Sequence, residues 1–410
     1  MKRLAYLLIF ALIASCSGLQ DSDKPANIEP AKPIHLQTKS RAMLEQNNAF
    51  AFDVFQAVSL QQSGNLFLSP YSLSAALGML YNGADGNTKA EIAKVLRMSD
   101  YTPEEVNAYY QELTKALLEV DPSSALSLAN AIWADQRVTL KQAFINLNQK
   151  YYDAEVSTLN FLQPAAVKVI NNWCSEKTKG TIPEIIKTID PATVVMLANA
   201  IYFKSSWTYG FEKSKTQNKP FHNLDGTTST VPLMQQKEKE LLYVLTDECS
   251  MVTLPYANTA FAMNLILPEE GQDLDALIAS LDKDYWALLQ SHHRPANVTL
   301  SMPRFKVEST LDKLVEVLMA LGMQEAFSDY ANFSAMLDVS VKVSDVIQKS
   351  YVSVDEEGTE AAAVTLILAD ATSVRPTPEK VTMVLDRPFV FAITEQSTGA
   401  ILFMGKVTKL

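Results

Sequence analysis

The chain has 410 residues, with 35 Lys and Arg against 46 Asp and Glu, which gives a formal net charge of −11. This acidic balance offers no basic face that could follow a phosphate backbone, so it argues against nucleic-acid binding. Hydrophobic residues make up 48% and charged residues 20%, proportions typical of a globular protein and unlike those of a disordered chain. Length alone allows two or three domains or a single large one.

The N-terminus indicates export. Basic residues at positions 2 and 3 precede an apolar stretch over residues 4–13, which is too short to span a bilayer and suits a signal-peptide core. Small residues then precede Cys16 and resemble a bacterial lipobox, in which cleavage frees the cysteine and lipid is attached to its sulfur. We therefore assign residues 1–15 to a lipoprotein signal peptide and residues 16–40 to a polar tether. The expected location is the outer membrane, facing the periplasm or the cell exterior. For the apolar stretch itself, a membrane anchor is the alternative to a signal peptide.

The remaining cysteines and the histidines indicate no special chemistry. With Cys16 lipidated, Cys174 and Cys249 are left far apart in sequence, and we interpret both as small buried side chains rather than as a disulfide framework. The four histidines form no spaced ligand set with cysteines or carboxylates, so no metal site and no cofactor are expected.

The hydrophobic pattern predicts an α+β fold. A helical rhythm over residues 41–60 opens the folded body, a short strand-like run ends at Pro70, and helical spacing resumes over residues 72–81. Apolar runs rich in β-branched and aromatic residues predict buried strands at 193–203, 251–255 and 261–267, and helical spacing returns at 311–321. Helices thus concentrate in the first 190 residues and strands in the second half.

The segment from Gly358 to Ser373 is unusual for a loop. Gly358 permits a backbone bend, and nine uncharged residues follow from Ala361 to Ala369. One interpretation is an Ala-rich helix over residues 360–369. The other is a strand: the alternate positions Thr359, Ala361, Ala363 and Thr365 are small, whereas Glu360 falls on the opposite side. As a strand, the small residues would enter a tight sheet interior and the charge would stay in water.

Four motifs together resemble the serpin family. They are Asn65-Leu-Phe-Leu-Ser-Pro-Tyr-Ser-Leu-Ser-Ala-Ala-Leu77, Asn199-Ala-Ile-Tyr-Phe-Lys204, Val354-Asp-Glu-Glu-Gly-Thr-Glu-Ala-Ala-Ala363 and Arg387-Pro-Phe-Val-Phe391 with Leu402-Phe-Met-Gly-Lys-Val407. They stand in the family's order and spacing, and the resemblance covers residues 42–410. It implies a single domain over residues 41–410, with three β-sheets, eight or nine helices and an exposed reactive-centre loop.

The resemblance implies a protease inhibitor that works once. Its loop is cut by a serine or cysteine endopeptidase, inserts into the main sheet and drags the covalent acyl-enzyme with it. The implied loop hinge comprises Glu356, Gly358, Thr359, Glu360, Ala361, Ala362 and Ala363. No proline, charge or bulky ring stands at Thr359, Ala361 or Ala363 to obstruct insertion, which favours an inhibitor over a non-inhibitory carrier, chaperone or signalling serpin. A hydrolase would need a nucleophile elbow, and no Gly-x-Ser-x-Gly occurs, so we expect no enzyme activity.

The scissile bond follows from the family's usual count of 15 residues from Gly358. This places the cut between Thr372 and Ser373, with the bonds at Ala371 and Val374 left open. Small residues before the cut suit elastase-like, subtilisin-like or papain-like targets. Trypsin-like targets are disfavoured because Arg375 is followed by proline.

The resemblance also implies a polar cluster beneath the opening sheet, formed by Ser69, Ser72 and Asn199. Ordinary turn and cap roles are the alternative for these residues. Gln348 stands where the family often has a histidine, and it cannot titrate near neutral pH. Trp207 falls where insertion begins, with a plain core aromatic as the other interpretation.

Beside the hinge, we expect Glu356 to pair with Arg304 across the strand ends. The expected partners of the whole protein are a target protease and a membrane reached through the N-terminal lipid, and we expect a monomer.

Overall fold

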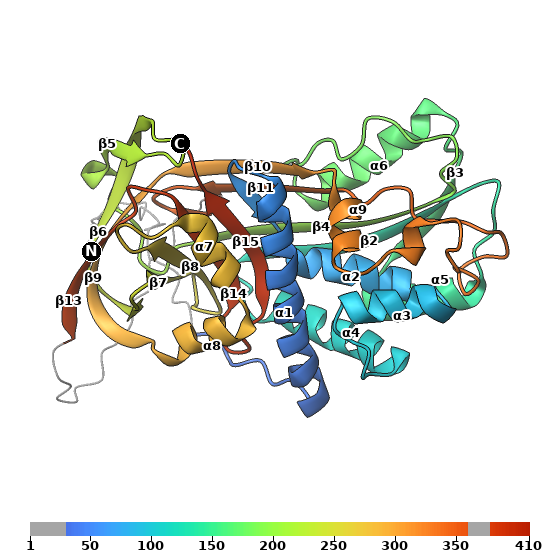
Figure 1. Cartoon of the computed structure of the whole chain (residues 1–410), viewed down its shortest axis with the longest axis horizontal. Coiled ribbons are helices and arrows are strands. Elements are labelled where there is room, and N and C mark those ends of the chain that lie inside the picture. Colours follow the sequence, from blue (N-terminus) through green and yellow to red (C-terminus); the bar gives the residue numbers. More distant parts are fainter. Residues whose placement is uncertain (1–29, 360–377) are drawn as a thin grey trace, which may run out of the picture.

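The protein forms one α+β body in the computed structural model, which describes residues 30–359 and 378–410 (Figure 1). Within these residues the helices are α1 (Thr38–Gln61), α2 (Pro70–Tyr81), α3 (Gly86–Val95), α4 (Pro103–Glu119), α5 (Gln142–Tyr152), α6 (Pro164–Lys177), α7 (Leu274–Ser280), α8 (Lys283–Ser291) and α9 (Leu314–Ala320). The 3-10 turns η1 (Lys213–Lys215) and η2 (Glu325–Phe327) are added to them. None of the helices in this part of the chain is long and apolar enough to cross a membrane.

Two hydrogen-bonded sheets carry the strands. The six-stranded sheet has the order β10-β11-β12-β4-β2-β3, and the nine-stranded sheet has the order β1-β15-β14-β8-β7-β6-β9-β13, with β5 paired to β6. The strands are β1 (Leu66–Leu68), β2 (Ala125–Asp135), β3 (Glu155–Leu159), β4 (Val195–Ser206), β5 (Gln217–His222), β6 (Thr228–Leu245), β7 (Cys249–Pro255), β8 (Phe261–Pro268), β9 (Arg294–Pro303), β10 (Phe305–Leu311), β11 (Gln348–Val354), β12 (Gly358–Thr359), β13 (Glu379–Val384), β14 (Phe389–Glu395) and β15 (Ile401–Val407).

The α+β prediction is confirmed, but the three sheets implied by the resemblance appear as two by hydrogen bonding. The cause is the long strand β6, which pairs with β5 and β9 and, beyond a register shift between Gln236 and Lys239, also with β7. One strand therefore belongs to two sheet regions and joins them into one ladder.

The predicted elements are present with small shifts at their ends. Helix α2 begins at Pro70 because the Ser69 side chain caps it, accepting from the Ser72 amide at 3.1 Å, and because proline fits the first helical position. The strands expected at 251–255 and 261–267 are β7 and β8, and both are almost wholly buried. Cys174 and Cys249 are free and buried, as predicted.

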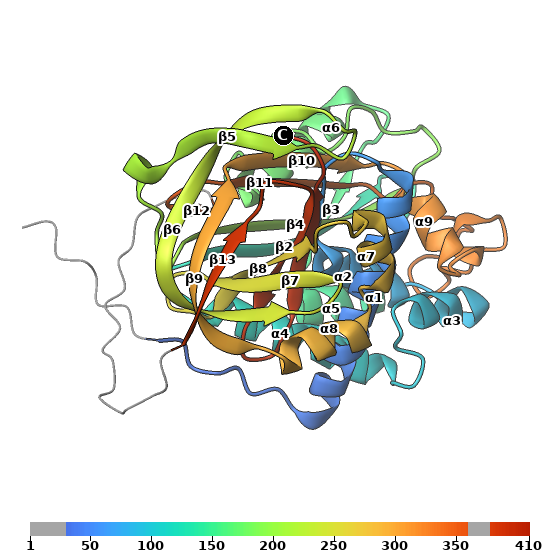
Figure 2. The same cartoon turned by 60° about the vertical axis from the view of Figure 1, so that its left-hand side comes forward.

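The main core lies between the nine-stranded sheet, the inner face of the six-stranded sheet and the helices α1 and α2 (Figures 1 and 2). A second, smaller cluster covers the outer face of the six-stranded sheet under α6, where Trp133 and Trp173 meet edge to face with ring centroids 5.3 Å apart. The six-stranded sheet is therefore covered on both faces along much of its length.

Candidate functional site

The candidate site is the place where the two-residue strand β12 enters the six-stranded sheet between β11 and β4 (Figure 2). Gly358 pairs with Ser206, and Thr359 pairs with Ser205 on β4 and with Val354 on β11. A tight turn leads into it, closed by the Asp355 amide, which donates to the Gly358 carbonyl at 3.0 Å. The chain thus turns back on β11 and begins a new central strand.

Gly358 is required by this geometry. Its φ is +155°, and a Cβ atom added to it would lie 2.1 Å from the backbone oxygen of Ser205. Because that neighbour is the backbone of a central strand, it cannot move aside cheaply. Any side chain at this position would expel β12 from the sheet.

Thr359 is held by aromatic side chains below it. It is 2% exposed, and its hydroxyl lies 2.6 Å from the hydroxyl of Tyr256. Tyr256 stacks on Trp207 with ring centroids 4.4 Å apart, and the Trp207 indole donates to the Asp355 carbonyl at 2.9 Å. Burial raises the pKa of Tyr256 well above its ordinary value, more than the hydrogen bond with Thr359 lowers it, so the phenol stays neutral.

Glu356 forms the expected pair with Arg304, in which the carboxylate is buried and the arginine is partly exposed. The Glu356 side chain is 1% exposed, and the Arg304 Nε atom lies 2.9 and 2.7 Å from its two oxygens. The hydroxyl of Thr216 donates to the same carboxylate at 2.5 Å. Burial alone would raise the pKa of Glu356, but the bonds from Arg304 and Thr216 outweigh it and hold the pKa below its ordinary value.

The predicted polar cluster is assembled at the opposite end of β11. Gln348 accepts from the Ser69 amide and donates to the Ser69 carbonyl, both at 2.9 Å, and the Ser72 hydroxyl donates to the Asn199 side chain. Sequence reasoning missed Asn130, whose side chain accepts from Asn199 at 2.7 Å. Its role follows from the register of β2 and β4, which places Asn130 opposite Asn199, and a local sequence pattern does not contain that register.

Trp207 lies apart from this cluster. It follows the opposite end of β4 and contacts the hinge rather than Ser69 or Gln348. The residues predicted for sheet opening are therefore divided between the upper end of the sheet, at Trp207, and its lower end, at Gln348.

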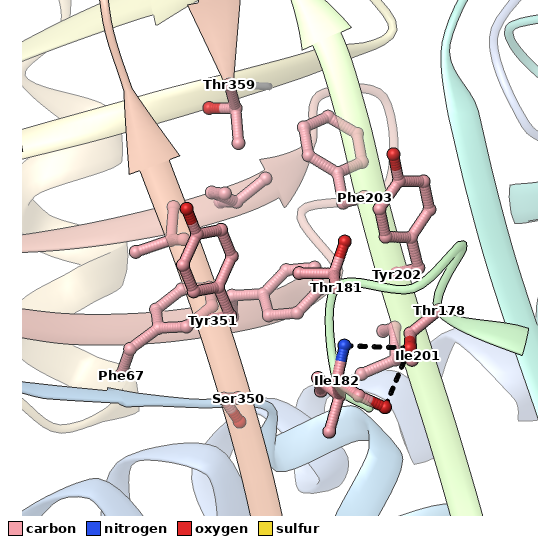
Figure 3. A pocket seen from close by; sticks show the side chains of 13 residues that line it. Phe67, Thr178, Thr181, Ile182, Ile201, Tyr202, Phe203, Ser350, Tyr351 and Thr359 are labelled. Carbon is pink, nitrogen blue, oxygen red and sulfur yellow. Dashed lines mark hydrogen bonds between the residues drawn. The ribbon is translucent and has the colours of Figure 1, made fainter. Parts of the chain in front are cut away.

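Between these two ends, no pairing joins β4 directly to β11 in the described residues. Figure 3 shows this narrow gap, with Thr359 above it and the labelled residues Tyr351 of β11 and Phe203 of β4 beside it. The segment after α6 spans the gap and is tied to β11 by Lys349, whose Nζ atom donates to the Glu184 carbonyl at 2.7 Å. The backbone edges of β4 and β11 that face each other are thus left without a strand between them.

Below the gap lies a cavity of about 690 Å³. Its floor is the apolar face of α2, and its walls are the first half of β4, the segment 185–194 and the segment 339–348. Ser72, Asn199 and Gln348 contribute the polar groups at its upper rim. The open strand position therefore continues downward into a cavity lined mainly by apolar side chains, with charged residues such as Lys342 and Asp345 on its walls.

Comparison with known proteins identifies the fold family. The family described as "Serpin (serine protease inhibitor)" matches residues 45–410. The chain belongs to the serpin family. A leukocyte elastase inhibitor of Sus scrofa is 33% identical over 375 residues, which cover 88% of this chain and 98% of that protein. An uncharacterized serpin-like protein of Thermococcus kodakarensis is 30% identical and covers 98% of this chain and 96% of its own length.

Solved serpin structures agree in fold. The native structure of tengpin, a thermophilic serpin, matches this serpin with a TM-score of 0.82 and 31% identity over 94% of this chain and 97% of that one. Thyroxine-binding globulin in complex with thyroxine matches with a TM-score of 0.80 and 30% identity over 90% of this chain and 99% of that one.

Several predicted site residues lie outside the described residues. They are the lipidation residue Cys16, the hinge residues Glu360, Ala361, Ala362 and Ala363, and the reactive-bond residues Thr372 and Ser373. Within the described hinge, Glu356, Gly358 and Thr359 lie together at the upper end of the sheet.

The Glu356 pair predicts a pH-dependent contribution to stability. A carboxylate whose folded-state pKa is lowered stabilises the fold above its unfolded pKa of about 4.3, and this contribution is lost as pH falls through the folded value. We expect Glu356→Gln to lower the apparent melting temperature at pH 7, with a difference from the parent that shrinks below about pH 4. Glu357→Gln is the matched control, because Glu357 pairs with the exposed Lys213. A difference that is constant with pH would contradict this assignment.

The steric limit at Gly358 predicts that Gly358→Ala releases the hinge. The test places a thiol probe at the hinge as Thr359→Cys, in a chain carrying Cys16→Ser, and measures its rate of labelling with and without Gly358→Ala. Because the position of residue 359 between Ser205 and Val354 is lost, we expect labelling to accelerate by about tenfold or more. Gly64→Ala is the control, since its Cβ would meet nothing within 4 Å, and it should leave labelling unchanged. Equal labelling in all three backgrounds would exclude a seated Thr359.

Proposed function

We propose that this serpin is a single-use inhibitor of serine or cysteine endopeptidases, which cut its reactive-centre loop and are trapped as the loop inserts between β4 and β11. The observation that carries the proposal is β12 itself, a central strand already begun above an unfilled strand position. Continuing that strand downward needs no rearrangement of its first rungs.

The register of β12 assigns a neighbour to each later loop residue. Thr359 pairs with Ser205, so in an antiparallel continuation Glu360 would lie opposite Lys204. The next inward positions, Ala361 and Ala363, would lie opposite the large residues Phe203 and Ile201. On the outer face of the sheet the Glu360 carboxylate would lie beside the Lys204 ammonium group. On the inner face the small alanine side chains would lie beside large apolar ones, and both arrangements support insertion of this segment.

The same register carries the loop into the polar cluster and the cavity. Thr365 would lie opposite Asn199 on β4 and opposite Gln348 on β11, where a hydroxyl can join the existing hydrogen bonds. Ile367 would lie opposite Leu197, a residue that lines the cavity. An apolar residue is therefore delivered to the cavity and a polar residue to the polar rim.

The driving force is the pairing that the uncut molecule lacks. The facing edges of β4 and β11 leave backbone groups without ladder partners, and each new bond contributes about 1 kcal/mol net. A strand continued from residue 360 to residue 369 would gain on the order of 10 kcal/mol from its bonds and would bury apolar area in the cavity as well. Such a gain would make insertion strongly favourable once the loop is cut.

We propose Thr372-Ser373 as the reactive bond and an elastase-like, subtilisin-like or papain-like protease as the target. Small side chains before the cut suit shallow specificity pockets, and proteins named leukocyte elastase inhibitor are among the similar sequences. We further propose export and attachment to a membrane through lipid on Cys16, which would place the inhibitor where secreted proteases act.

The alternative is a non-inhibitory serpin such as a carrier. The similarity to thyroxine-binding globulin in complex with thyroxine keeps this alternative open at the level of the fold. The small hinge residues and the open strand position favour the inhibitor, because a carrier has no need of either.

Trapping predicts a complex that survives denaturation. The mature chain with Cys16→Ser is incubated with elastase-like, subtilisin-like and papain-like proteases and separated on denaturing gels. We expect a band near the summed mass of protease and inhibitor, and a released C-terminal peptide that begins at Ser373 by mass spectrometry. Thr359→Arg should give only clipped product, because Thr359 is 2% exposed and a charge there would be buried. Clipped product from the parent chain with every protease class would favour the carrier.

The assigned register predicts a position-specific block at Ile367. Ile367→Asp would bring a carboxylate into the apolar cavity, so we expect insertion to stop short and most of the protein to be cleaved as substrate. Glu360→Gln is the control, since residue 360 would face outward beside Lys204 and trapping should persist. The measurement is the number of inhibitor molecules consumed for each protease molecule inactivated. Equal numbers for both variants would refute the register.

A further inference from the structure

The segment that precedes α1 is fastened to the folded body along its length. The Ala31 amide donates to the Asn258 carbonyl at 3.0 Å, the Ile34 amide to the Ser397 hydroxyl at 2.9 Å, and the Gln37 amide to the Glu112 carboxylate at 3.0 Å. The side chains of Ala31, Ile34 and Leu36 pack against the main core. We name residues 30–37 the N-terminal strap; it appears in dark blue in Figure 2.

The strap lies outside the residues that match the serpin family model. The serpin match begins at residue 45, beyond the strap, and our assigned tether extended to residue 40. The hydrogen bonds from residues 31, 34 and 37 place the edge of the ordered body nearer residue 31.

The strap joins two hairpin turns at one end of the nine-stranded sheet. One turn, residues 256–260, links β7 to β8, and the other, residues 396–400, links β14 to β15. The Gln396 amide donates to the Ala260 carbonyl at 2.8 Å, so the turns also hold each other. Ala31 therefore holds the turn 256–260 directly. Ile34 holds the turn 396–400, which bonds to the turn 256–260.

The turn 256–260 needs such support because its backbone is strained. Ala257 has a φ of 36° and Thr259 a φ of 74°, and left-handed backbone is unfavourable for both residue types. Asn258 stabilises the turn from inside, since its side chain accepts from the Ala260 amide at 3.0 Å. Its carbonyl accepts the bond from the strap, so the strap completes the support.

The same turn holds the hinge in its seated position. The Ala257 amide donates to the Ser206 carbonyl at 2.8 Å, and Ser206 is the residue that pairs with Gly358. Tyr256, the first residue of the turn, makes the 2.6 Å contact with the Thr359 hydroxyl. A shift of the turn would move both the rung opposite Gly358 and the partner of Thr359.

We propose that the N-terminal strap positions the reactive-loop hinge: by fixing the strained turn 256–260, it keeps Gly358 and Thr359 seated as the first rungs of the inserting strand. Its consequence for inhibition rests on the proposed function. Loss of the strap would unseat the hinge, slow the start of insertion and let more acyl-enzyme hydrolyse. The seating itself is a property of the uncut molecule and needs no protease.

The test is amide hydrogen exchange of the uncut mature chain with Cys16→Ser. Ala31→Pro removes the amide that donates to the Asn258 carbonyl, and Ile34→Ser removes the apolar packing of the Ile34 side chain against the core. The two substitutions are combined in one variant. We expect exchange to accelerate about fivefold, the effect of one lost hydrogen bond, in the amides of residues 256–260 and also at Gly358 and Thr359. Lys32→Ala with His35→Ala is the matched control within the strap, because both side chains are exposed.

Two further variants separate the contacts of the strap from those of the hinge. Ser397→Ala removes the acceptor for Ile34 and the hydroxyl's own bond to Glu395 but leaves the bond between Ala31 and Asn258, so it should give a smaller change in the same amides. Tyr256→Phe removes the contact with Thr359 and should accelerate exchange at the hinge while the strap stays protected. Faster exchange confined to residues 30–37 and the turns, with the hinge unchanged, would overturn the positioning role. Because exchange is measured without protease, failure of trapping and failure of the strap are separate results.

Discussion

The structure depends on one unfilled position in a sheet. Strands β4 and β11 face each other across a gap, with β12 between them for only two residues. A strand edge without a neighbouring strand lacks the ladder bonds that a central position in a sheet would provide. Specific bonds define the two ends of the gap. The Glu356 pair and Thr359 lie at one end, and Ser69 and Gln348 lie at the other. The proposed inhibition uses the free energy that closing this gap would release.

The two ends are built from different chemistry. At the upper end a buried carboxylate, an arginine and stacked aromatic rings give a rigid seat with specific bonds. At the lower end neutral hydroxyl and amide groups stand above an apolar cavity of about 690 Å³. Neutral hydrogen bonds can be exchanged for new ones at little cost, whereas a buried ion pair cannot be broken without leaving a charge unpaired. The upper end is therefore suited to start a strand, and the lower end is suited to receive one.

Much of the fold could be predicted from sequence, because its signals are local. Ser69-Pro70 marks the start of α2 by cap chemistry, and the runs at 251–255 and 261–267 mark β7 and β8 by composition. Of the small residues at alternate hinge positions that predicted a strand, only Thr359 lies within the described residues, where it is paired in the sheet. The missed partners Asn130 and Tyr256 owe their roles to register between strands distant in sequence, which no local pattern contains. The strap was assigned to the tether because its polar, proline-containing sequence has no periodicity, although its contacts are mostly made by backbone amides.

Gln348 makes the hydrogen bonds of the lower cluster independent of pH, because its side chain does not titrate. A histidine in its place would take up a proton near neutral pH and would then donate from both ring nitrogens, but Ser69 presents one donor and one acceptor to it. The glutamine amide matches both and carries no charge at any ordinary pH. The ion pair at the end where the strand begins depends instead on a carboxylate, Glu356, whose pKa is held below its ordinary value by Arg304 and Thr216. Protonation of Glu356 would weaken the seat of the hinge, whereas the two bonds between Ser69 and Gln348 would persist, so the two ends of the gap respond differently to acid.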